Sequence, residues 1–298
     1  MEVIKTGVFS VVGRPNVGKS TLMNALCGTK IAIVSDKPQT TRTRITGVLT
    51  KGEYQMVFLD TPGLHKPKNR LGDFMVKIVN ETVSDVDTAI LLVEPVARIG
   101  IPEQMLIDRI KQFNMPAILV INKIDTVEKE KLLEVMAVYG QAHDFLEIIP
   151  LSAKTGDGLG LLEDTLKGQC FDSPALFPED MVSDQPERQV VAEIIREKLL
   201  TLLDKEVPHG TAVEIEQFSE REGSDIMDIS AVIYCERNSH KGIIIGAKGA
   251  MLKKIGELAR KDIEDGLGCK VYLQLWVKVK EDWRNSLGLI RNFGYDER

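Results

Sequence analysis

The sequence predicts an α/β protein of two parts, in which a doubly wound domain with a mainly parallel sheet precedes a smaller α+β domain. In the first part, short apolar runs of strand length alternate with helix-compatible segments, which is typical of a parallel sheet covered by helices. A proline-containing stretch without helical period follows, and the remainder has the order helix, strand, strand, helix, strand. We therefore expect domains at 1–172 and 187–298, joined by a linker at 173–186.

Composition sets outer limits on the function. With 298 residues, 43% of them hydrophobic, the chain is long enough for two cores. Its four cysteines stand far apart without a C-x-x-C pair, which favours neither a zinc site nor a disulfide framework. We find no charged-then-apolar N-terminal signal and no apolar run of membrane-spanning length, so we expect a cytosolic protein.

Charge is distributed unevenly along the chain. The net charge of −6 argues against indiscriminate binding of nucleic acid. Residues 237–280, however, hold ten basic and four acidic side chains, a net +6, so the rest of the chain sums to −12. This segregation indicates an anion-binding face near the C-terminus, although a charge run is also common on ordinary solvated surface.

A glycine-bounded loop follows the first apolar run, residues 8–12, and opens a helix-compatible segment. Its pattern, G-x-x-x-x-G-K-S, lets backbone N–H groups turn toward phosphate oxygens at a helix N-terminus. The lysine suits the β- and γ-phosphates, and the serine hydroxyl suits a bridging Mg²⁺. The expected nucleotide-binding residues are Gly13, Arg14, Pro15, Asn16, Val17, Gly18, Lys19 and Ser20.

The polar segment 35–44 is expected to be a mobile loop. A hydroxyl here would close on Mg²⁺ while a γ-phosphate is present, which couples nucleotide state to loop order. Thr41 is the candidate and Thr40 the alternative, and an ordinary threonine-rich loop would look the same.

An apolar strand at 55–59 delivers Asp60 to its carboxyl end, the ligand-binding edge of an open α/β sheet. We expect Asp60 to complete the Mg²⁺ shell together with Ser20 and Thr41. The N–H of Gly63 is placed to bond the γ-phosphate, with Thr61, Pro62 and Leu64 lining the same turn. The loop at 64–70 looks like a second switch segment.

Base choice is predicted by N-K-I-D, which follows an apolar run at 116–121. The carboxylate of Asp125 is only an acceptor, so it suits the two donors of guanine and favours GTP over ATP. Asn122 is expected to brace neighbouring loops, while the stem of Lys123 lies along the base, next to Ile124. The string S-A-K, which is Ser152, Ala153 and Lys154, follows another apolar run. We expect the N–H of Ala153 to donate to guanine O6.

Taken together, G-R-P-N-V-G-K-S, Q-T-T-R, D-T-P-G, N-K-I-D and S-A-K resemble the translation-factor-related class of P-loop GTPases over roughly the first 170 residues. This resemblance implies Mg²⁺-dependent GTP hydrolysis to GDP, with switch loops at 35–44 and 60–72. We expect Lys19, Thr41, Gly63 and Asn16 to carry catalysis.

One position departs from the Ras-like pattern. Leu64 stands where those enzymes place a water-orienting glutamine, so intrinsic turnover is expected to be slow. In similar GTPases an asparagine at the position of Asn16 holds K⁺, which acts like an arginine finger. The alternative is that Asn16 only stabilises its loop.

In the second part, a helix is expected from residue 187, followed by strands at 212–218, 226–234 and 270–280. Between the last two strands lies G-x-x-G, after a short apolar segment and before a basic helix. Alone it would predict a plain turn, but in this order it resembles a type II KH domain, which grips single-stranded RNA. The expected RNA-binding residues are Gly246, Ala247, Lys248, Gly249, Lys253 and Lys254.

Both parts, with the late strings E-L-A-R-K-D and L-W-V-K-V-K, resemble the bacterial Era GTPase family nearly end to end. The resemblance implies a switch that binds the 3′ end of 16S ribosomal RNA and acts in 30S subunit assembly and rRNA maturation, with peripheral association at the cell membrane. We expect the protein to be a monomer. The alternatives are a signalling GTPase whose second domain binds a protein or membrane partner, and a P-loop ATPase or kinase, which Asp125 disfavours.

Overall fold

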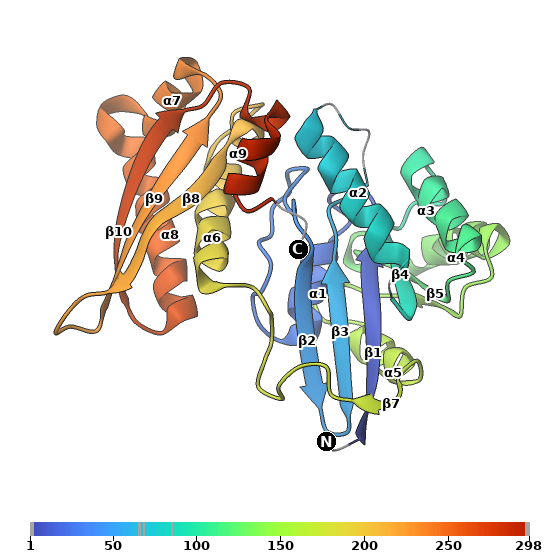
Figure 1. The fold of residues 1–298 in the computed structure, drawn as a ribbon. Coiled ribbons are helices and arrows are strands. Elements are labelled where there is room, and N and C mark those ends of the chain that lie inside the picture. Colours follow the sequence, from blue (N-terminus) through green and yellow to red (C-terminus); the bar gives the residue numbers. More distant parts are fainter. Residues whose placement is uncertain (1–2, 65–66, 68, 85, 296–298) are drawn as a thin grey trace. The chain divides into compact units, whose positions relative to one another are not determined.

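The computed structural model describes residues 3–64, 67, 69–84 and 86–295. The chain divides into two compact units, one of residues 1–68 and 72–184 and one of residues 69–71 and 185–298 (Figure 1). Each unit has its own sheet and its own hydrophobic core, and the two are described separately.

The sheet of the first unit has the strand order β2-β3-β1-β4-β5-β6, with β7 paired to the start of β1. Its strands are β1 (Val3–Val12), β2 (Ile45–Lys51), β3 (Tyr54–Asp60), β4 (Thr88–Val93), β5 (Ala117–Ile121), β6 (Glu147–Pro150) and β7 (Phe171–Pro174). All described pairs are parallel except β2 with β3 and β7 with β1. The predicted doubly wound, mainly parallel sheet is confirmed.

Helices cover both faces of this sheet, which explains why β4 and β5 are buried at every position. Side chains of α1 (Lys19–Cys27) and α5 (Leu159–Lys167) pack on one face. Those of α2 (Arg70–Ser84), α3 (Ile101–Gln112) and α4 (Lys129–Ala142) pack on the other. The loops that leave the carboxyl ends of the parallel strands therefore gather at one edge of the sheet.

The segment after β7 differs from the linker expected at 173–186. Gln55 is fully buried in β3, and its Oε1 accepts from the N–H groups of Leu176 (2.7 Å) and Phe177 (2.9 Å). Its Nε2 donates to the carbonyl of Phe177 at 2.8 Å. Because of such bonds, residues up to 184 belong to the first unit, although their sequence has no periodic pattern.

The second unit has a three-stranded sheet in the order β10-β9-β8. Its strands are β8 (Ala212–Glu220), β9 (Ile226–Cys235) and β10 (Lys270–Val279), with β10 parallel and β8 antiparallel to β9. The helices α6 (Glu187–Leu202), α7 (Asn238–Ile245) and α8 (Ala250–Leu267) pack on one face of it. The predicted order of elements is confirmed, and the segment expected only as a short apolar run is the helix α7.

The C-terminal segment adds a small aromatic cluster that the sequence did not predict. Trp283 is fully buried in η4 (Trp283–Asn285) and donates its indole N–H to the carbonyl of Gly210 at 3.0 Å. The ring of Phe293, at the end of α9 (Leu287–Asn292), lies 4.8 Å from that of Tyr234 and 5.3 Å from that of Trp283. Tyr234 alternates with core-facing Ile233, so this segment covers part of the second face of the sheet.

The remaining short helices are η1 (Ile124–Thr126), η2 (Pro208–Gly210) and η3 (Ala247–Gly249). Among the described residues, no helix has the length and apolar character needed to cross a membrane.

Candidate nucleotide-binding site and nucleic-acid groove

The phosphate-type loop joins β1 to α1 and requires its two glycines. Gly18 has a φ of 102°, and a Cβ there would lie 2.3 Å from the amide nitrogen of Asn122. A Cβ on Gly13 would lie 2.5 Å from the carbonyl oxygen of Leu92. The backbone can approach these neighbours, and any phosphate, only where no side chain intervenes.

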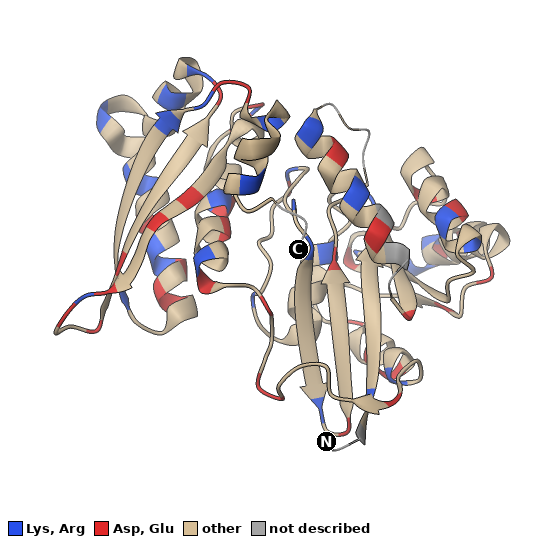
Figure 2. Cartoon of the chain, in the orientation of Figure 1, with Lys and Arg blue, Asp and Glu red and all other residues tan. Residues whose placement is uncertain are grey.

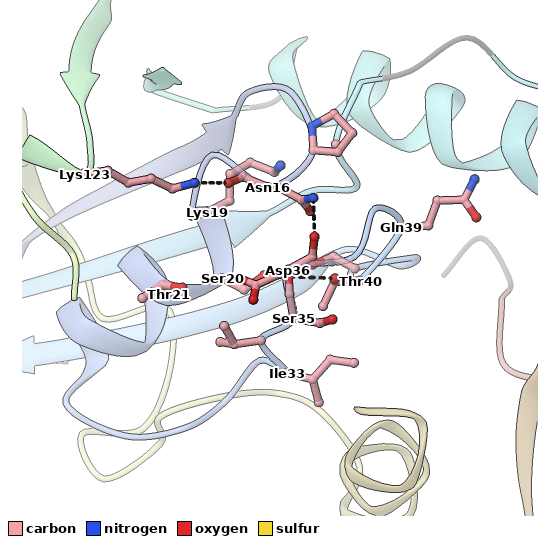
Figure 3. A pocket seen from close by; sticks show the side chains of 15 residues that line it. Asn16, Lys19, Ser20, Thr21, Ile33, Ser35, Asp36, Gln39, Thr40 and Lys123 are labelled. Atoms are coloured by element: carbon pink, nitrogen blue, oxygen red, sulfur yellow. Dashed lines mark hydrogen bonds between the residues drawn. The ribbon is translucent and has the colours of Figure 1, made fainter. Parts of the chain in front are cut away.

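A cavity of ≈ 260 Å³ lies beside this loop (Figure 3). Residues of the loop itself, of the polar segment 33–41, and Gly63 and Lys123 line it. Lys19 is buried, and its Nζ donates to the carbonyls of Gly13 (3.3 Å) and Arg14 (3.1 Å). Burial lowers the pKa of Lys19, which the charge of Asp60 opposes.

The three predicted Mg²⁺ ligands lie together. The hydroxyl of Ser20 donates to Oδ2 of Asp60 at 2.8 Å and lies 2.9 Å from the hydroxyl of Thr41, which donates to the same oxygen at 3.2 Å. Oδ1 of Asp60 is buried and has no hydrogen-bond partner among the described residues. Burial raises the pKa of Asp60, opposed by Lys19 and by both hydroxyls.

An unpaired buried carboxylate oxygen beside two hydroxyls is a donor set that fits Mg²⁺, which prefers oxygen ligands. Thr40 lies differently, because its hydroxyl donates to the carbonyl of Lys37 at 2.6 Å, within its own loop. Of the two threonines, the structure therefore brings Thr41 to the cluster.

The turn after Asp60 is tightly packed. A Cβ on Gly63 would lie 2.7 Å from the backbone nitrogen of Pro15, so glycine is required there. The hydroxyl of Thr61 donates to the carbonyl of Val11 at 3.1 Å and thus braces β1. Pro62 is buried beside it.

Leu64 is 6% exposed and belongs to the core between the sheet and α2, α3 and α4, so its side chain packs there. A leucine in that core cannot orient a water molecule in the cavity. In the second predicted switch segment, His65, Lys66 and Lys68 lie outside the described residues.

Asn122 connects three loops. Its Nδ2 donates to the carbonyl of Val17 at 2.8 Å, and its Oδ1 accepts from the N–H of Ala153 at 2.9 Å. The Ala153 N–H is therefore engaged with Asn122 in this structure, and bonding to guanine O6 would require it to share or exchange that bond.

Asp125 and Ser152 lie at the proposed base end of the site. The hydroxyl of Ser152 donates to Oδ1 of Asp125 at 2.7 Å. This hydrogen bond lowers the pKa of Asp125 against the opposing effect of burial, so the carboxylate is ionised at neutral pH. The backbone N–H of Ile124 donates to the carbonyl of Leu151. The side chain of Lys154 is exposed.

Sequence reasoning missed Glu94, which contacts two of the predicted residues. Its Oε1 accepts from Nζ of Lys123 at 2.6 Å, and its Oε2 accepts from the guanidinium of Arg14. The signal that would have found it is its position, directly after the buried strand β4 at the carboxyl edge of the sheet.

The G-x-x-G turn joins α7 to α8 in the second unit. Gly246 has a φ of 71°, and a Cβ there would lie 2.7 Å from Cβ of Met251. Lys248 and Gly249 also have left-handed backbones, with φ of 51° and 81°. The turn is therefore compact, and Ala247 and Lys248 are exposed on it.

A groove of ≈ 400 Å³ runs from this turn between α8 and β10. Its lining residues are Gly249, Leu252, Lys253, Gly256, Glu257, Arg260, Leu273 and Leu275. α7 carries one lysine, and α8 carries four basic and four acidic side chains, whereas the only charged side chains of β8 are three glutamates (Figure 2). Of the predicted RNA residues, Gly249 and Lys253 line the groove, and the exposed Lys254 does not.

The sequence prediction missed the apolar wall of this groove. Leu273 and Leu275, in the strand predicted at 270–280, are half-buried and line the groove. Gly256 follows Lys253 and precedes Arg260 on one face of α8, a spacing of three and four residues that could have indicated the groove-lining stripe.

Family models match both parts of the chain, and relatives match nearly its full length. A family model described as 50S ribosome-binding GTPase matches residues 8–123, and a KH domain model matches residues 206–284. GTPase Era of Alkaliphilus oremlandii is 53% identical over 292 residues, covering 98% of this chain and 99% of that protein. GTPase Era of Clostridioides difficile is 51% identical over 297 residues, covering 99% and 100%.

Two solved structures match over 99% of this chain and 100% of theirs, each with a TM-score of 0.95 at 40% identity. One is a variant of Aquifex aeolicus Era bound to GDP.AlF4-, and the other is Era in complex with MgGDPNP and nucleotides 1506–1542 of 16S ribosomal RNA. With a nucleotide-type cavity in one unit, a G-x-x-G groove in the other and full-length identity near 50% to such relatives, the chain belongs to the Era family of GTPases.

Proposed function

We propose that the protein is a GTP-driven switch that binds the 3′ end of 16S ribosomal RNA and acts in assembly of the small ribosomal subunit and maturation of its RNA. The observation that carries the proposal is the groove beside G-x-x-G, in a chain that matches, along 99% of its length, an Era structure holding nucleotides 1506–1542 of that RNA. A groove with leucines on one wall and cations on its rim suits unpaired bases and their phosphates.

For the nucleotide, we propose that Lys19 and the loop N–H groups hold the β- and γ-phosphates. Ser20, Thr41 and Asp60 would hold Mg²⁺, which neutralises charge on the phosphates when bound. The N–H of Gly63 would then bond the γ-phosphate. When hydrolysis removes that phosphate, the loop that follows Gly63 would be released.

Guanine would lie between the stem of Lys123 and the carboxylate of Asp125. Ser152 fixes that carboxylate with its hydroxyl, which leaves the other oxygen available to the donors of the base. The Ala153 N–H would reach O6 only by sharing its bond to Asn122.

We also propose that Asn16 recruits K⁺ during hydrolysis. Its amide nitrogen lies 2.6 Å from the carbonyl oxygen of Asp36, so the side chain bridges the phosphate loop and the first switch loop. Turning the amide would place two oxygens side by side, a donor set that fits K⁺. Since Leu64 packs in the core, such help would raise an otherwise slow turnover.

The small subunit is our proposed target, rather than the large subunit named in the description of the matching GTPase model, because the RNA in the full-length structural relative is 16S RNA. A monomeric state is a further proposal, as is the peripheral membrane contact that the family resemblance implies. Sedimentation at several protein concentrations and flotation with anionic vesicles test them.

The proposed RNA target is tested by filter binding with an RNA of nucleotides 1506–1542 of 16S ribosomal RNA. The control is an RNA of equal length from the large subunit. We expect tighter binding of the 16S segment, and stronger binding with a non-hydrolysable GTP analogue than with GDP. Equal affinity for both RNAs would contradict the assignment of the target.

A further inference from the structure

Glu94 connects the two loops that would enclose the nucleotide. It follows β4, and its side chain is 26% exposed. One carboxylate oxygen accepts from Nζ of Lys123 at 2.6 Å, and the other accepts from the guanidinium of Arg14. A single carboxylate thus joins the N-K-x-D loop to the phosphate loop.

The contact matters because the backbone of Lys123 is strained. Lys123 has a φ of 64°, a left-handed conformation that costs free energy in a lysine, and Asn16 has a φ of 66°, which asparagine adopts more readily. Nζ of Lys123 donates to the carbonyl of Asn16 at 2.7 Å, so the strained lysine is bonded to the phosphate loop (Figure 3). Such strain persists only where surrounding contacts over-determine it.

Glu94 itself is held in place from behind. The Arg14 guanidinium that bonds it also lies 3.4 Å from Oε1 of Glu103, whose side chain is 5% exposed in the first turn of α3. Burial raises the pKa of Glu94, but the hydrogen bonds and charges of Lys123 and Arg14 lower it by more. The net effect is a lowered pKa, so the carboxylate is ionised at neutral pH.

We propose that Glu94 is a positioning residue for guanine nucleotides, which holds the ammonium of Lys123 and thereby fixes the lysine stem against the base. The inference rests on the proposed place of guanine between Lys123 and Asp125. Glu94 makes no hydrogen bond to Ser20, Thr41 or Asp60, so we expect its effect on nucleotide affinity to exceed its effect on the hydrolysis step.

The test is Glu94→Gln, which keeps the shape of the side chain and removes its charge. We expect the affinities for GDP and GTP to fall together by about tenfold, because an amide weakens the hydrogen bonds to both Lys123 and Arg14 and turns an N–H toward one of these cations. The loss should be seen as faster dissociation of a fluorescent GDP, while kcat at saturating GTP stays within about twofold of the native value. A GDP affinity within about twofold of native would overturn the proposal.

Glu163→Gln is the matched control. The Oε1 of Glu163 also bonds two cations, Lys51 at 2.8 Å and Lys167 at 3.0 Å, and its side chain is 19% exposed. Its loss should disturb the fold of the unit to a similar degree and leave GDP affinity unchanged. An equal drop in both variants would mean that general destabilisation, not positioning, explains the result.

A double-mutant cycle with Lys123→Ala identifies the route of the effect. In that background, Glu94→Gln should change GDP affinity by less than about twofold, because the ammonium that it positions is gone. Full additivity would overturn the proposal. Should Glu94→Gln unfold, Glu94→Asp keeps the charge on a shorter stem, and it should show a smaller loss in the same cycle.

The failure of this inference is distinguishable from failure of the proposed base site. If Asp125→Asn loses guanine preference while Glu94→Gln binds as the native protein does, only the positioning role is wrong. If Asp125→Asn keeps full preference for guanine, the proposed place of the base is wrong.

Discussion

The hydroxyl of Ser152 donates a 2.7 Å hydrogen bond to Oδ1 of Asp125, which fixes the carboxylate at the base end of the nucleotide site. Asp125→Asn should therefore lower GTP affinity by at least about tenfold, because an amide presents a donor to a base that itself donates. The variant should gain affinity for xanthosine triphosphate, whose extra oxygen matches the amide. Competition binding with both nucleotides and ATP measures this.

The pH dependence of GDP binding follows from the same bond. Because the pKa of Asp125 is lowered, its carboxylate is ionised at any pH above the ordinary range of Asp pKa values. Its negative charge is lost only when the pH falls through the lowered pKa. We expect GDP affinity to change little between about pH 8 and about pH 5.5. A tenfold fall across this interval, absent in Asp125→Asn, would mean that the carboxylate titrates within it.

Thr41 and Thr40 are neighbours with different contacts, which provides a paired test of the Mg²⁺ site. Thr41→Val removes the hydroxyl that bonds Asp60, so we expect half-maximal hydrolysis to need about tenfold more Mg²⁺, equivalent to ~1.5 kcal/mol. Thr40→Val removes bonds from its hydroxyl to the carbonyls of Lys37 and Ser35 within its own loop and should need no more Mg²⁺ than the native protein. The reverse order of effects would assign Thr40 as the ligand.

The role of Asn16 is tested by exchanging the monovalent cation. Hydrolysis should be faster in KCl than in NaCl at equal ionic strength, because Na⁺ is smaller than the ion that the proposed pair of oxygens fits. Asn16→Ala should remove the difference and preserve GDP affinity, since the carbonyl that accepts from Lys123 remains. If the native protein hydrolysed GTP at the same rate in both salts, Asn16 would not recruit K⁺. Its role would then be structural, through its hydrogen bond to the carbonyl of Asp36.

The buried Gln55 makes the segment after β7 part of the first unit. Gln55→Leu leaves the N–H groups of Leu176 and Phe177 without their acceptor, at a cost of about 1–3 kcal/mol for that local structure. Hydrogen exchange in a peptide covering 175–183 should accelerate accordingly, while β1 and β4 stay protected. Gln141→Leu, on the exposed end of α4, is the control and should leave that peptide unchanged.

Much of this architecture is predictable from the sequence because its elements follow local patterns. The buried strand Ala117–Ile121 is a continuous apolar run, and β10 alternates at every position, so hydrophobic periodicity identifies both. The phosphate loop is predictable because only glycine tolerates the approach of Asn122 and Leu92.

What escaped prediction depends on contacts between residues distant in sequence. Glu94 has no local pattern that distinguishes it from a solvated acid, and its role requires Arg14 and Lys123 to meet it in the fold. Gln55 binds residues more than a hundred positions away, and the ring of Phe293 packs on that of Tyr234 in β9 as well as on that of Trp283. The engagement of Ala153 with Asn122 is of the same kind.

The G-x-x-G turn can be tested as the RNA site by reversing the charge that it presents. Ala247→Asp with Lys248→Asp places two negative charges on an exposed turn at the mouth of the groove, where phosphates should lie. The fold should tolerate both, because neither residue packs in the core and acidic side chains suit a helix N-terminus. RNA binding should be lost, and each lost phosphate contact should reduce the dependence of log affinity on log salt by about 0.7.

The matched control is Asn238→Asp with Lys280→Asp, which changes the net charge equally at exposed positions that do not line the groove. Filter binding of a short pyrimidine-rich RNA across a KCl series compares the two proteins. GTP affinity and hydrolysis should stay near native in both, since the nucleotide site lies in the first unit. If the turn variant bound RNA as the control does, phosphates would not lie at this turn, and the groove would lose its assignment as the RNA site.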